Sequence, residues 1–441
     1  MRRLTLLLYA CPAFVIALPT IPVYVALPTL YGVELGLGLA KTGLILLCGR
    51  LFDTVSDPLI GYLSDRFPLG SHRRKPWIAG GAIVAGLGLA MILNPLPGAG
   101  ISYLLVWSIV LYTGWTMVAV PYMAWGAELS DGYEERTRVT AWREGIGLLG
   151  LVGAGALTAA ATAVGWSEKE SIGFLAWVAI ALGAIVFPVL LMGVSEASPR
   201  AHEKRIGVFP ERLFGLRSLL DNGPFLRLIA AWFLNGLANG IPAALFFLYL
   251  EYALGAGETQ RPIFILIYFV SAVAAIPVWK FVSTRVGKHR AWCFAMLIAC
   301  VAFATVPWIP EGAFGAFMVV CIVTGAALGA DLVLPPSMQA DVVDFQTWRS
   351  GQVSTGLLFA LWGMGTKLAL AASVGIALPA VDVAGFDPAA PTASGILALS
   401  VIYALVPVVI KLSAILLVWH FPLTHRKHVV IGRALDRRQK I

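Results

Sequence analysis

The chain has 441 residues, of which 59% are hydrophobic and only 13% are charged. This balance excludes a cytosolic enzyme, a disordered protein and a nucleic-acid binder, despite the formal net charge of +8. The five cysteines lie in apolar stretches without the spacing of a metal site, and we interpret them as buried apolar side chains.

Twelve apolar stretches follow one another along the chain, and a helix that crosses a bilayer needs ~20 such residues. They span residues 4–30, 42–63, 77–96, 101–129, 139–165, 172–194, 225–254, 262–282, 291–309, 313–335, 355–381 and 395–421. The first stretch is longer than a signal-peptide core and has no small-residue cleavage site, so we expect it to be retained. The sequence therefore predicts an all-α polytopic membrane protein with twelve transmembrane helices.

The distribution of Lys and Arg predicts the orientation, because cytoplasmic loops retain positive charge. With both termini in the cytoplasm, only Lys41, Lys169 and Arg261 of the 32 basic residues fall on the outer side, and a few lie within helices. We expect a multi-pass protein of the cell inner (plasma) membrane, which contacts membrane lipids and is a monomer.

The chain divides into two halves that resemble each other. Gly70-Ser71-His72-Arg73, after the second stretch, recurs as Gly287-Lys288-His289-Arg290 after the eighth. A twofold repeat of six helices is typical of secondary transporters, whose substrate site lies at mid-membrane between the halves. We predict an N-terminal six-helix bundle (1–194), a cytoplasmic linker (195–222), a C-terminal six-helix bundle (223–421) and a basic cytoplasmic tail (422–441).

The second stretch contains three charged residues, Arg50, Asp53 and Asp57, at spacings of three and four that place them on one helix face. Two carboxylates one turn apart in a low dielectric cannot both ionise unless a cation joins them. Charges inside spans mark functional sites, so the pattern predicts a site for a coupling cation. The alternative is a structural salt bridge from Arg50 to one of the carboxylates.

Several motifs in a fixed order resemble those of the glycoside-pentoside-hexuronide:cation symporters, the melibiose-carrier-like branch of the major facilitator superfamily (MFS). The first is Asp-Thr-Val-Ser-Asp-Pro at 53–58. The others are Arg-Arg-Lys-Pro-Trp at 73–77, Val-Pro-Tyr at 120–122, Glu-Leu-Ser at 128–130, Glu-Arg-Thr at 135–137, Arg143, Ala-Asp-Val-Val-Asp-Phe at 340–345, and Lys367.

The resemblance implies the major facilitator fold and a defined cation site. In the family, two carboxylates, the polar residue before the second and a hydroxyl on the fourth helix surround Na⁺, Li⁺ or H⁺. Here these positions are Asp53, Ser56, Asp57 and Thr116, with Asp53 and Asp57 as the Na⁺ ligands if the coupling ion is sodium. Oxygen ligands suit a hard cation. Ser56 replaces the amide of melibiose carriers, which leaves Na⁺ and H⁺ both open, and no other cofactor is expected.

The sugar site departs from the family. Melibiose carriers bind galactosides with acids on the first and fourth helices, where this chain has the apolar segment 16–18 and Ala119. Other residues are left as substrate candidates, namely Trp115, Tyr122, Arg143, Asn235, Asn239, Asp331, Trp362 and Lys367.

These candidates also have structural interpretations. The aromatic residues are typical of packing or of the membrane interface, and Asn235 and Asn239 could hold helices together. A salt bridge between Asp331 and Lys367 would explain both, and we interpret Lys411 as a packing or snorkelling residue.

The segment 61–66, with Arg73 and Arg74, resembles the superfamily's loop between helices two and three, and Glu128 and Arg138 are possible partners for its charges. These charged residues are gating candidates, because charged pairs there would hold one state and break in the other. An arginine-rich loop would also serve orientation alone. The candidates are Asp65, Arg66, Arg73, Arg74, Glu128 and Arg138.

Together these features predict a secondary active transporter that works by alternating access. It would couple Na⁺ or H⁺ to symport of a small polar or anionic solute, such as a glycoside. The sequence lacks a Walker loop, zinc spacing and a Gly-x-Ser-x-Gly elbow, which argues against an enzyme or an ATP-driven pump. The alternatives are a lysolipid or amphiphile carrier on the same fold and a non-transporting membrane sensor.

Overall fold

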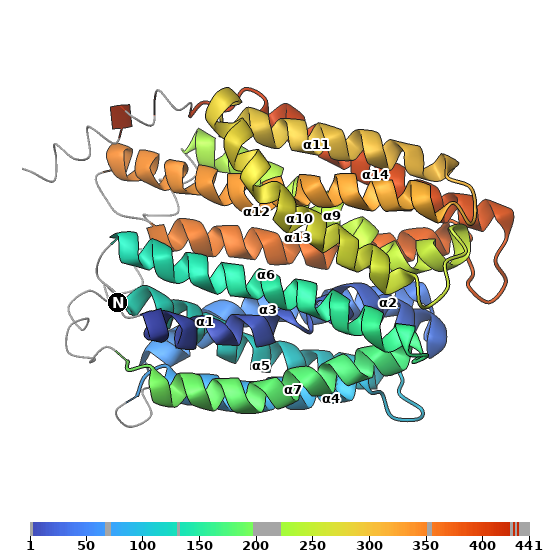
Figure 1. Ribbon diagram of the computed structural model, residues 1–441, viewed down its shortest axis with the longest axis horizontal. Coiled ribbons are helices and arrows are strands. Elements are labelled where there is room, and N and C mark those ends of the chain that lie inside the picture. The colour runs from blue at the N-terminus through green and yellow to red at the C-terminus, as the bar shows by residue number, and fades with distance from the viewer. Residues whose placement is uncertain are drawn as a thin grey trace, which may run out of the picture. The chain divides into compact units, whose positions relative to one another are not determined.

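The computed structural model describes residues 3–66, 72–129, 133–196, 222–350, 355–423, 427 and 430–431. Long helices joined by short loops make up most of this structure (Figure 1). In chain order they are α1 (Arg3–Ala17), η1 (Pro22–Ala26), α2 (Leu27–Thr29), η2 (Leu30–Glu34), α3 (Leu39–Arg66), α4 (Lys75–Leu93), α5 (Ile101–Glu128), α6 (Tyr133–Ala163), α7 (Glu168–Gly193), α9 (Gly223–Leu248), η4 (Tyr249–Ala253), α10 (Arg261–Val286), α11 (Lys288–Thr305), η5 (Val306–Trp308), α12 (Phe314–Ser350), α13 (Thr355–Val383) and α14 (Ala393–Val418).

Within the described residues, eleven helical segments are long and apolar enough to cross a membrane. The remaining long helix, α3, has 28 residues, which is ample length for a span, but it carries the charged residues Arg50, Asp53 and Asp57. The all-α membrane architecture predicted from the sequence is therefore confirmed, and α3 is the helix whose charges need an explanation.

The first span is not one regular helix. It runs over Arg3–Glu34 and contains two π-helical segments, η1 and η2. Four prolines in this span lack the amide hydrogen that a regular helix needs, and neighbouring helices make such interruptions tolerable in a membrane. Pro12 lies inside α1, whereas Pro19, Pro22 and Pro28 lie in the irregular part of the span that follows Ala17.

The tenth span is longer than the sequence predicted. We expected it to end at Pro335, but α12 continues through Pro335 and Pro336 to Ser350. A proline pair removes two amide donors without preventing helix formation where neighbouring helices support the freed carbonyls. The motif at 340–345 therefore lies on the same helix as Asp331.

The chain forms two compact units. Unit 1 comprises Met1–Lys204, Ala243–Leu266 and Val374–Ile396, and unit 2 comprises Arg205–Pro242, Ile267–Ser373 and Leu397–Ile441. Unit 1 thus includes two segments from the second half of the sequence. The four-part division at 194, 222 and 421 stays a prediction, because most of the linker (197–221) and of the tail (424–426, 428–429 and 432–441) lies outside the described residues.

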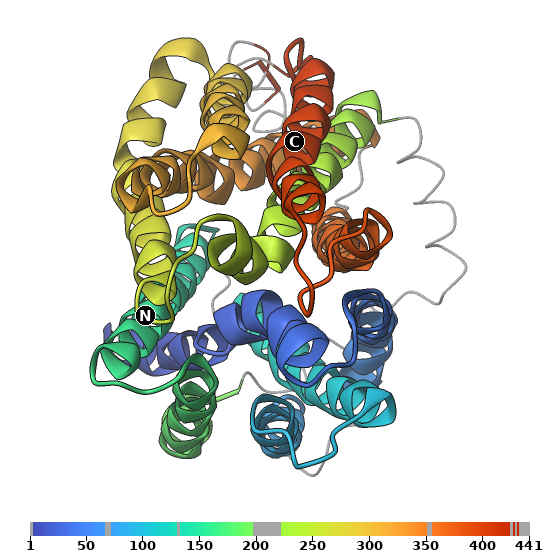
Figure 2. The ribbon, with the colours of Figure 1, turned by 90° about the vertical axis from the view of Figure 1, so that its right-hand side faces the viewer.

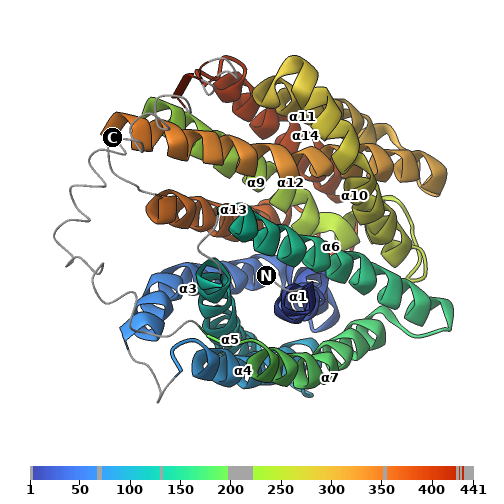
Figure 3. The same cartoon turned by 60° about the vertical axis from the view of Figure 1, so that its left-hand side comes forward.

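Close helix packing in unit 1 depends on glycine. Helices α4 and α5 lie against each other, and α4 also contacts α7 while α1 contacts α6 and α7 (Figure 3). A Cβ at Gly88 would lie 2.6 Å from the Cα of Leu111, and a Cβ at Gly114 would overlap the backbone of Ala85. Small residues let membrane helices approach at backbone distance, so these glycines position α5 and its side chains.

Unit 2 contains an aromatic and aliphatic core between its helices. Helices α11 and α12 pack side by side (Figure 2), and Trp292 of α11 is fully buried there with Leu228, Ala330 and Ala414. These residues come from α9, α11, α12 and α14, which hold the polar side chains of this unit in place.

Candidate functional site

The predicted cation-site residues lie together in unit 1. Thr116 of α5 donates a hydrogen bond to Asp53 Oδ1 (2.8 Å) and also lies 3.0 Å from Asp57 Oδ1, both on α3. The Ser56 hydroxyl lies 3.5 Å from that of Thr116 and donates to the carbonyl of Asp53. Asp53, Ser56 and Thr116 are buried, and Asp57 is half-buried. The four predicted residues therefore form one cluster of oxygens.

The chemistry of this cluster favours a cation. A threonine hydroxyl has one hydrogen, so Thr116 cannot donate full hydrogen bonds to Asp53 and Asp57 at once. Two carboxylates that converge on one oxygen in a buried site are stabilised by a proton or by a metal cation between them. The donor set, two carboxylates and two hydroxyls, is all oxygen and suits Na⁺ or H⁺.

Arg50 lies on the same helix as these carboxylates and is 3% exposed. Its guanidinium lies over the ring of Tyr24 at 4.1 Å from the ring centroid, a cation–π contact within unit 1. The aromatic face stabilises the buried charge near the two carboxylates.

The substrate candidates of unit 1 have different environments. Tyr122 packs on α1: its hydroxyl donates to the carbonyl of Tyr9 (2.5 Å), the Tyr9 hydroxyl donates to the carbonyl of Tyr122 (2.9 Å), and the rings stack. Arg143 of α6 is paired with Glu144 (2.6 Å), which is itself largely exposed. Trp115 of α5 borders a pocket.

That pocket is apolar, and its lining residues come from α1, α4, α5 and α7. It has a volume of about 480 Å³, and its lining includes Ile83, Leu87, Trp115, Phe187 and Leu191. Ile83 is 75% exposed at its edge. Trp115, which lines the apolar pocket, and Thr116, which belongs to the oxygen cluster, are consecutive residues of α5.

The candidates of unit 2 form a second polar cluster. Asp331 of α12 accepts hydrogen bonds from Asn239 Nδ2 (2.9 Å) and Trp292 Nε1 (2.6 Å). Lys411 of α14 donates to Asn235 Oδ1 (2.6 Å) and Asn239 Oδ1 (2.7 Å). These partners replace the Asp331–Lys367 salt bridge that we considered from the sequence.

Lys411 is the residue of this cluster that sequence reasoning missed. It is buried, and Asn239 links it to Asp331, so packing or snorkelling does not describe it. A cavity of about 10 Å³ beside Asn239, Asp331 and Lys411 is close to the size of one water. The sequence shows a lysine in an apolar span and two asparagines one helical turn apart. It does not show that the lysine donates hydrogen bonds to both asparagines.

The two substrate candidates on α13 are Trp362 and Lys367, and Trp362 stacks on a second tryptophan. Trp362 lies against Trp232 of α9, with ring centroids 4.5 Å apart and an interplanar angle of 16°. Trp232 Nε1 donates to the hydroxyl of Thr366 (2.7 Å), which neighbours the half-buried Lys367 in sequence. The stack places Trp362 in the core of unit 2.

The gating candidates are only partly visible. The carboxylate of Glu196 accepts hydrogen bonds from the backbone amides of Arg73, Arg74 and Lys75 at the start of α4, and Arg74 Nη1 donates to Ser64 Oγ (3.0 Å). Arg138 is exposed. The side chains of Asp65, Arg66 and Glu128 lie outside the described residues.

The corresponding repeat in unit 2 forms an ion pair. Lys288, at the start of α11, lies 2.7 and 2.8 Å from the two carboxylate oxygens of Asp341 on α12. Asp341 belongs to the motif at 340–345, so a residue of this family-like motif forms the ion pair with Lys288.

The chain matches a known protein family over most of its length. Residues 8–425 match the family described as MFS/sugar transport protein. The human sodium-dependent lysophosphatidylcholine symporter 1 is 24% identical over 433 residues, which cover 90% of this chain and 79% of that protein. The glucuronide carrier protein homolog of Escherichia coli K12 is 21% identical over 420 residues, 92% of this chain and 89% of that protein.

Solved structures show the same fold. The nucleoside transporter NupG aligns with a TM-score of 0.70 at 13% identity, over 95% of this chain and all of that one. A D-xylose-proton symporter aligns with a TM-score of 0.71 at 11% identity, over 95% and 97%.

Proposed function

The chain belongs to the family of MFS/sugar transport proteins and is a membrane transporter, and from this premise we propose that Asp53 and Asp57 bind the cation that drives substrate symport. The family confirms the class of function that the sequence predicted. The observation that carries the cation site is the convergence of both carboxylates on the Thr116 hydroxyl, at 2.8 and 3.0 Å.

Sodium is the coupling ion in this proposal. Several of the relatives are named as sodium-dependent symporters, and the oxygen cluster of this chain has the ligand chemistry that Na⁺ needs. Asp57 is half-buried while Asp53 is buried, so we infer that the ion enters past Asp57. Ser56 and Thr116 complete the site.

The orientation follows from charge. Both termini lie in the cytoplasm of the proposed topology, because only Lys41, Lys169 and Arg261 of the basic residues then fall outside the cell. We propose the plasma membrane as the location of the protein and a monomer as its oligomeric state. The ends at which α7 and α10 begin therefore face outside.

An amphiphile with a charged headgroup is the first substrate candidate. The apolar pocket of about 480 Å³ that Trp115 borders has the size and lining for an acyl chain, and it adjoins the helix that carries Thr116. In the same unit, Arg143 is a cation that suits an anionic or zwitterionic headgroup. Lysophosphatidylcholine, named in the relatives, is a solute of this class.

An anionic glycoside is the second candidate. The match to the glucuronide carrier homolog covers 92% of this chain, and a glucuronide carries a carboxylate that the Arg143 guanidinium of unit 1 would recognise. A neutral galactoside is not favoured, because Ala119 replaces the family carboxylate on α5.

Calorimetry distinguishes the two candidates. Purified protein would be titrated with lysophosphatidylcholine below its micelle concentration, a nitrophenyl glucuronide and melibiose, with and without Na⁺. We expect sodium-dependent binding of the lysolipid. Sodium-dependent binding of the glucuronide alone would favour the second candidate, and submillimolar melibiose binding would contradict both.

A further inference from the structure

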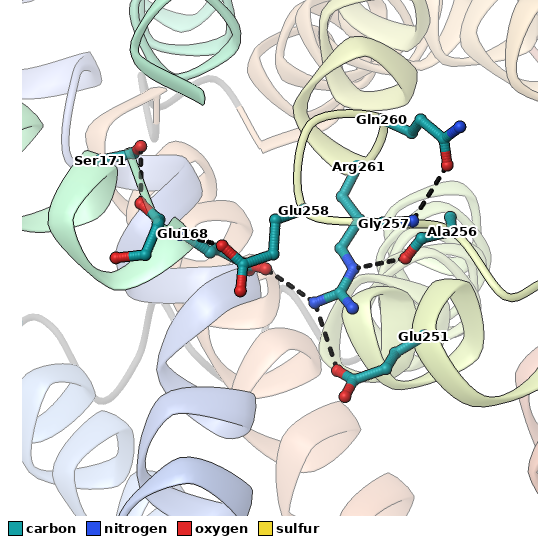
Figure 4. A network of polar contacts seen from close by, with 9 residues as sticks. Glu168, Ser171, Glu251, Ala256, Gly257, Glu258, Gln260 and Arg261 are labelled. Carbon is teal, nitrogen blue, oxygen red and sulfur yellow. Dashed lines mark hydrogen bonds and ion pairs between the residues drawn. The ribbon is translucent and has the colours of Figure 1, made fainter. Parts of the chain in front are cut away.

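A buried ion cluster lies in unit 1 where α7 and α10 begin (Figure 4). Arg261 Nη1 lies 2.8 Å from Glu168 Oε2 and 3.2 Å from Glu251 Oε2. Arg261 Nε donates to the carbonyl of Ala256 (3.1 Å), and the Glu168 amide donates to Glu258 Oε2 (2.9 Å). The Arg261 and Glu168 side chains are only 10% and 8% exposed. Apart from the positive charge of Arg261, which contributes to the orientation, these residues have no part in the cation or substrate sites.

The cluster joins the two halves of the sequence. Glu168 begins α7 of the first half, whereas Glu251 and Arg261 belong to η4 and α10 of the second. All of them lie in unit 1, which takes in Ala243–Leu266 and Val374–Ile396 from the second half. The ion pairs therefore hold segments together that the predicted repeat assigns to different bundles.

Helix packing at the same end of these helices is equally close. A Cβ at Gly43 would lie 2.9 Å from Leu378 Cβ, and one at Gly375 would lie 2.6 Å from Leu47 Cδ2. A Cβ at Gly155 would lie 3.3 Å from Leu266 Cα. Three contacts between the sequence halves thus accompany the Arg261 cluster within unit 1, so the two halves are in contact at this end.

The energetics of such a cluster suit a contact that opens and closes. Burying an arginine and two carboxylates has a desolvation penalty that largely offsets their attraction, so the intact cluster is close to neutral against its separated, hydrated parts. Loss of Arg261 leaves Glu168 buried without its cation, which is strongly unfavourable. The closed form of this end therefore depends on Arg261.

We propose that Arg261 is the outer gate residue of the transport cycle, which holds the external end closed through Glu168 and Glu251. The proposal rests on the orientation and the alternating-access function given above. In the outward-open state the cluster separates, and each charge is hydrated. Glu251, which is 34% exposed, is the partner that water reaches first.

Thiol labelling in intact cells tests the gate. The full chain, with its five cysteines replaced by alanine, would carry Leu378→Cys, a buried position beside Gly43. A membrane-impermeant maleimide would be added outside. We expect Arg261→Gln to raise the labelling rate about ten-fold and Glu251→Gln about three-fold, which correspond to modest shifts of the open–closed equilibrium. Lys169→Gln, an exposed neighbour of Glu168, should leave it unchanged.

General loosening must be separated from gating. Ala414→Cys, buried in unit 2, should stay unlabelled in every variant. Labelling of Ala414→Cys at the same rate as Leu378→Cys would overturn the proposal. So would a labelling rate at Leu378→Cys that neither Arg261→Gln nor Glu251→Gln changes. If Arg261→Gln does not fold, the milder Glu251→Gln decides the outcome. Labelling needs no substrate, so failure of the substrate proposal in the binding assay leaves this result interpretable.

Discussion

Buried charges in this chain are held by side chains from other helices, and this determines what single substitutions do. Asp53 accepts a hydrogen bond from Thr116 of α5, and Lys411 donates hydrogen bonds to Asn235 and Asn239 of α9. Removing one partner of a buried polar group leaves the other without compensation. Substitutions at these positions should therefore act through the partner that remains.

Thr116→Val tests the hydroxyl between the two carboxylates. It keeps the volume of the side chain but removes the oxygen, and we expect Na⁺ affinity to fall about ten-fold, since a hydrogen bond to a charged group contributes ~1.5–3 kcal/mol. Sodium titration calorimetry measures this. Thr113→Val is the matched control, because the Thr113 hydroxyl donates to the carbonyl of Ile109 in its own helix. Equal Na⁺ affinity in both variants would remove Thr116 from the site.

Arg143→Ala and Lys367→Ala test the charge selectivity of the substrate site. Each removes one candidate cation, Arg143 from unit 1 and Lys367 from unit 2. The variant that lacks the cation of the headgroup should bind substrate about ten-fold more weakly and retain its Na⁺ affinity. Binding of lysolipid and of Na⁺ would be measured on the same preparations. Lys280→Ala, at an exposed position of α10, should bind as the parent does. Loss of folded protein without a binding defect would favour a structural role.

Lys411→Met tests the polar cluster of unit 2. It should lower stability by about 3 kcal/mol, because it leaves Asp331 and the two asparagines buried without the lysine charge. Adding Asp331→Asn removes the uncompensated carboxylate, so the double variant should be more stable than Lys411→Met. Thermal unfolding in detergent measures both. Strictly additive losses would show that the two charges are not coupled.

At the scale of elements, glycine sets how closely the helices of unit 1 approach. Gly88→Ala would place a methyl group 2.6 Å from the Leu111 backbone, so α4 and α5 must separate, at a cost of ~1–3 kcal/mol. Gly145→Ala on α6 is the control, since its Cβ would meet nothing within 4 Å. Unfolding temperatures in detergent should therefore fall for the first variant only. An equal fall in both would rule out the close-packing explanation.

The elements show what local sequence determines. The four-residue spacing of Asp53 and Asp57 was enough to place them on one helix face, because helical geometry is local. The extent of α12 was predicted wrongly, since prolines at 335 and 336 end an isolated helix but not one supported by neighbours. The π-helical segments of the first span were likewise not predicted, although its four prolines are evident in the sequence.

The partners of the buried charges could not be derived from spacing. Lys411 lies 176 residues from Asn235, and Arg261 lies 93 residues from Glu168. Such pairs depend on how whole helices pack, which no local pattern encodes. Thr116 was identified only through the family resemblance. The sequence therefore predicted the class of protein and the shared helix face of Asp53 and Asp57, whose role as cation ligands stays a prediction. The structure supplied the Lys411 and Arg261 clusters.

Symport requires that ion binding and substrate movement are coupled through the protein. A monovalent cation between Asp53 and Asp57 offsets one of the two carboxylate charges, so the state with ion bound differs in charge from the empty state. A change of conformation that is unfavourable with two bare carboxylates becomes possible once they share a cation. Uptake against a gradient should then depend on both acids.

Sodium-driven accumulation in proteoliposomes tests this most directly. The parent protein should accumulate labelled lysolipid or glucuronide, whichever binds, when an inward Na⁺ gradient is imposed. Asp57→Asn and Asp53→Asn, which conserve volume, should fold normally and show no gradient-driven accumulation. Accumulation at the parent rate in either variant would contradict the cation site at Asp53 and Asp57.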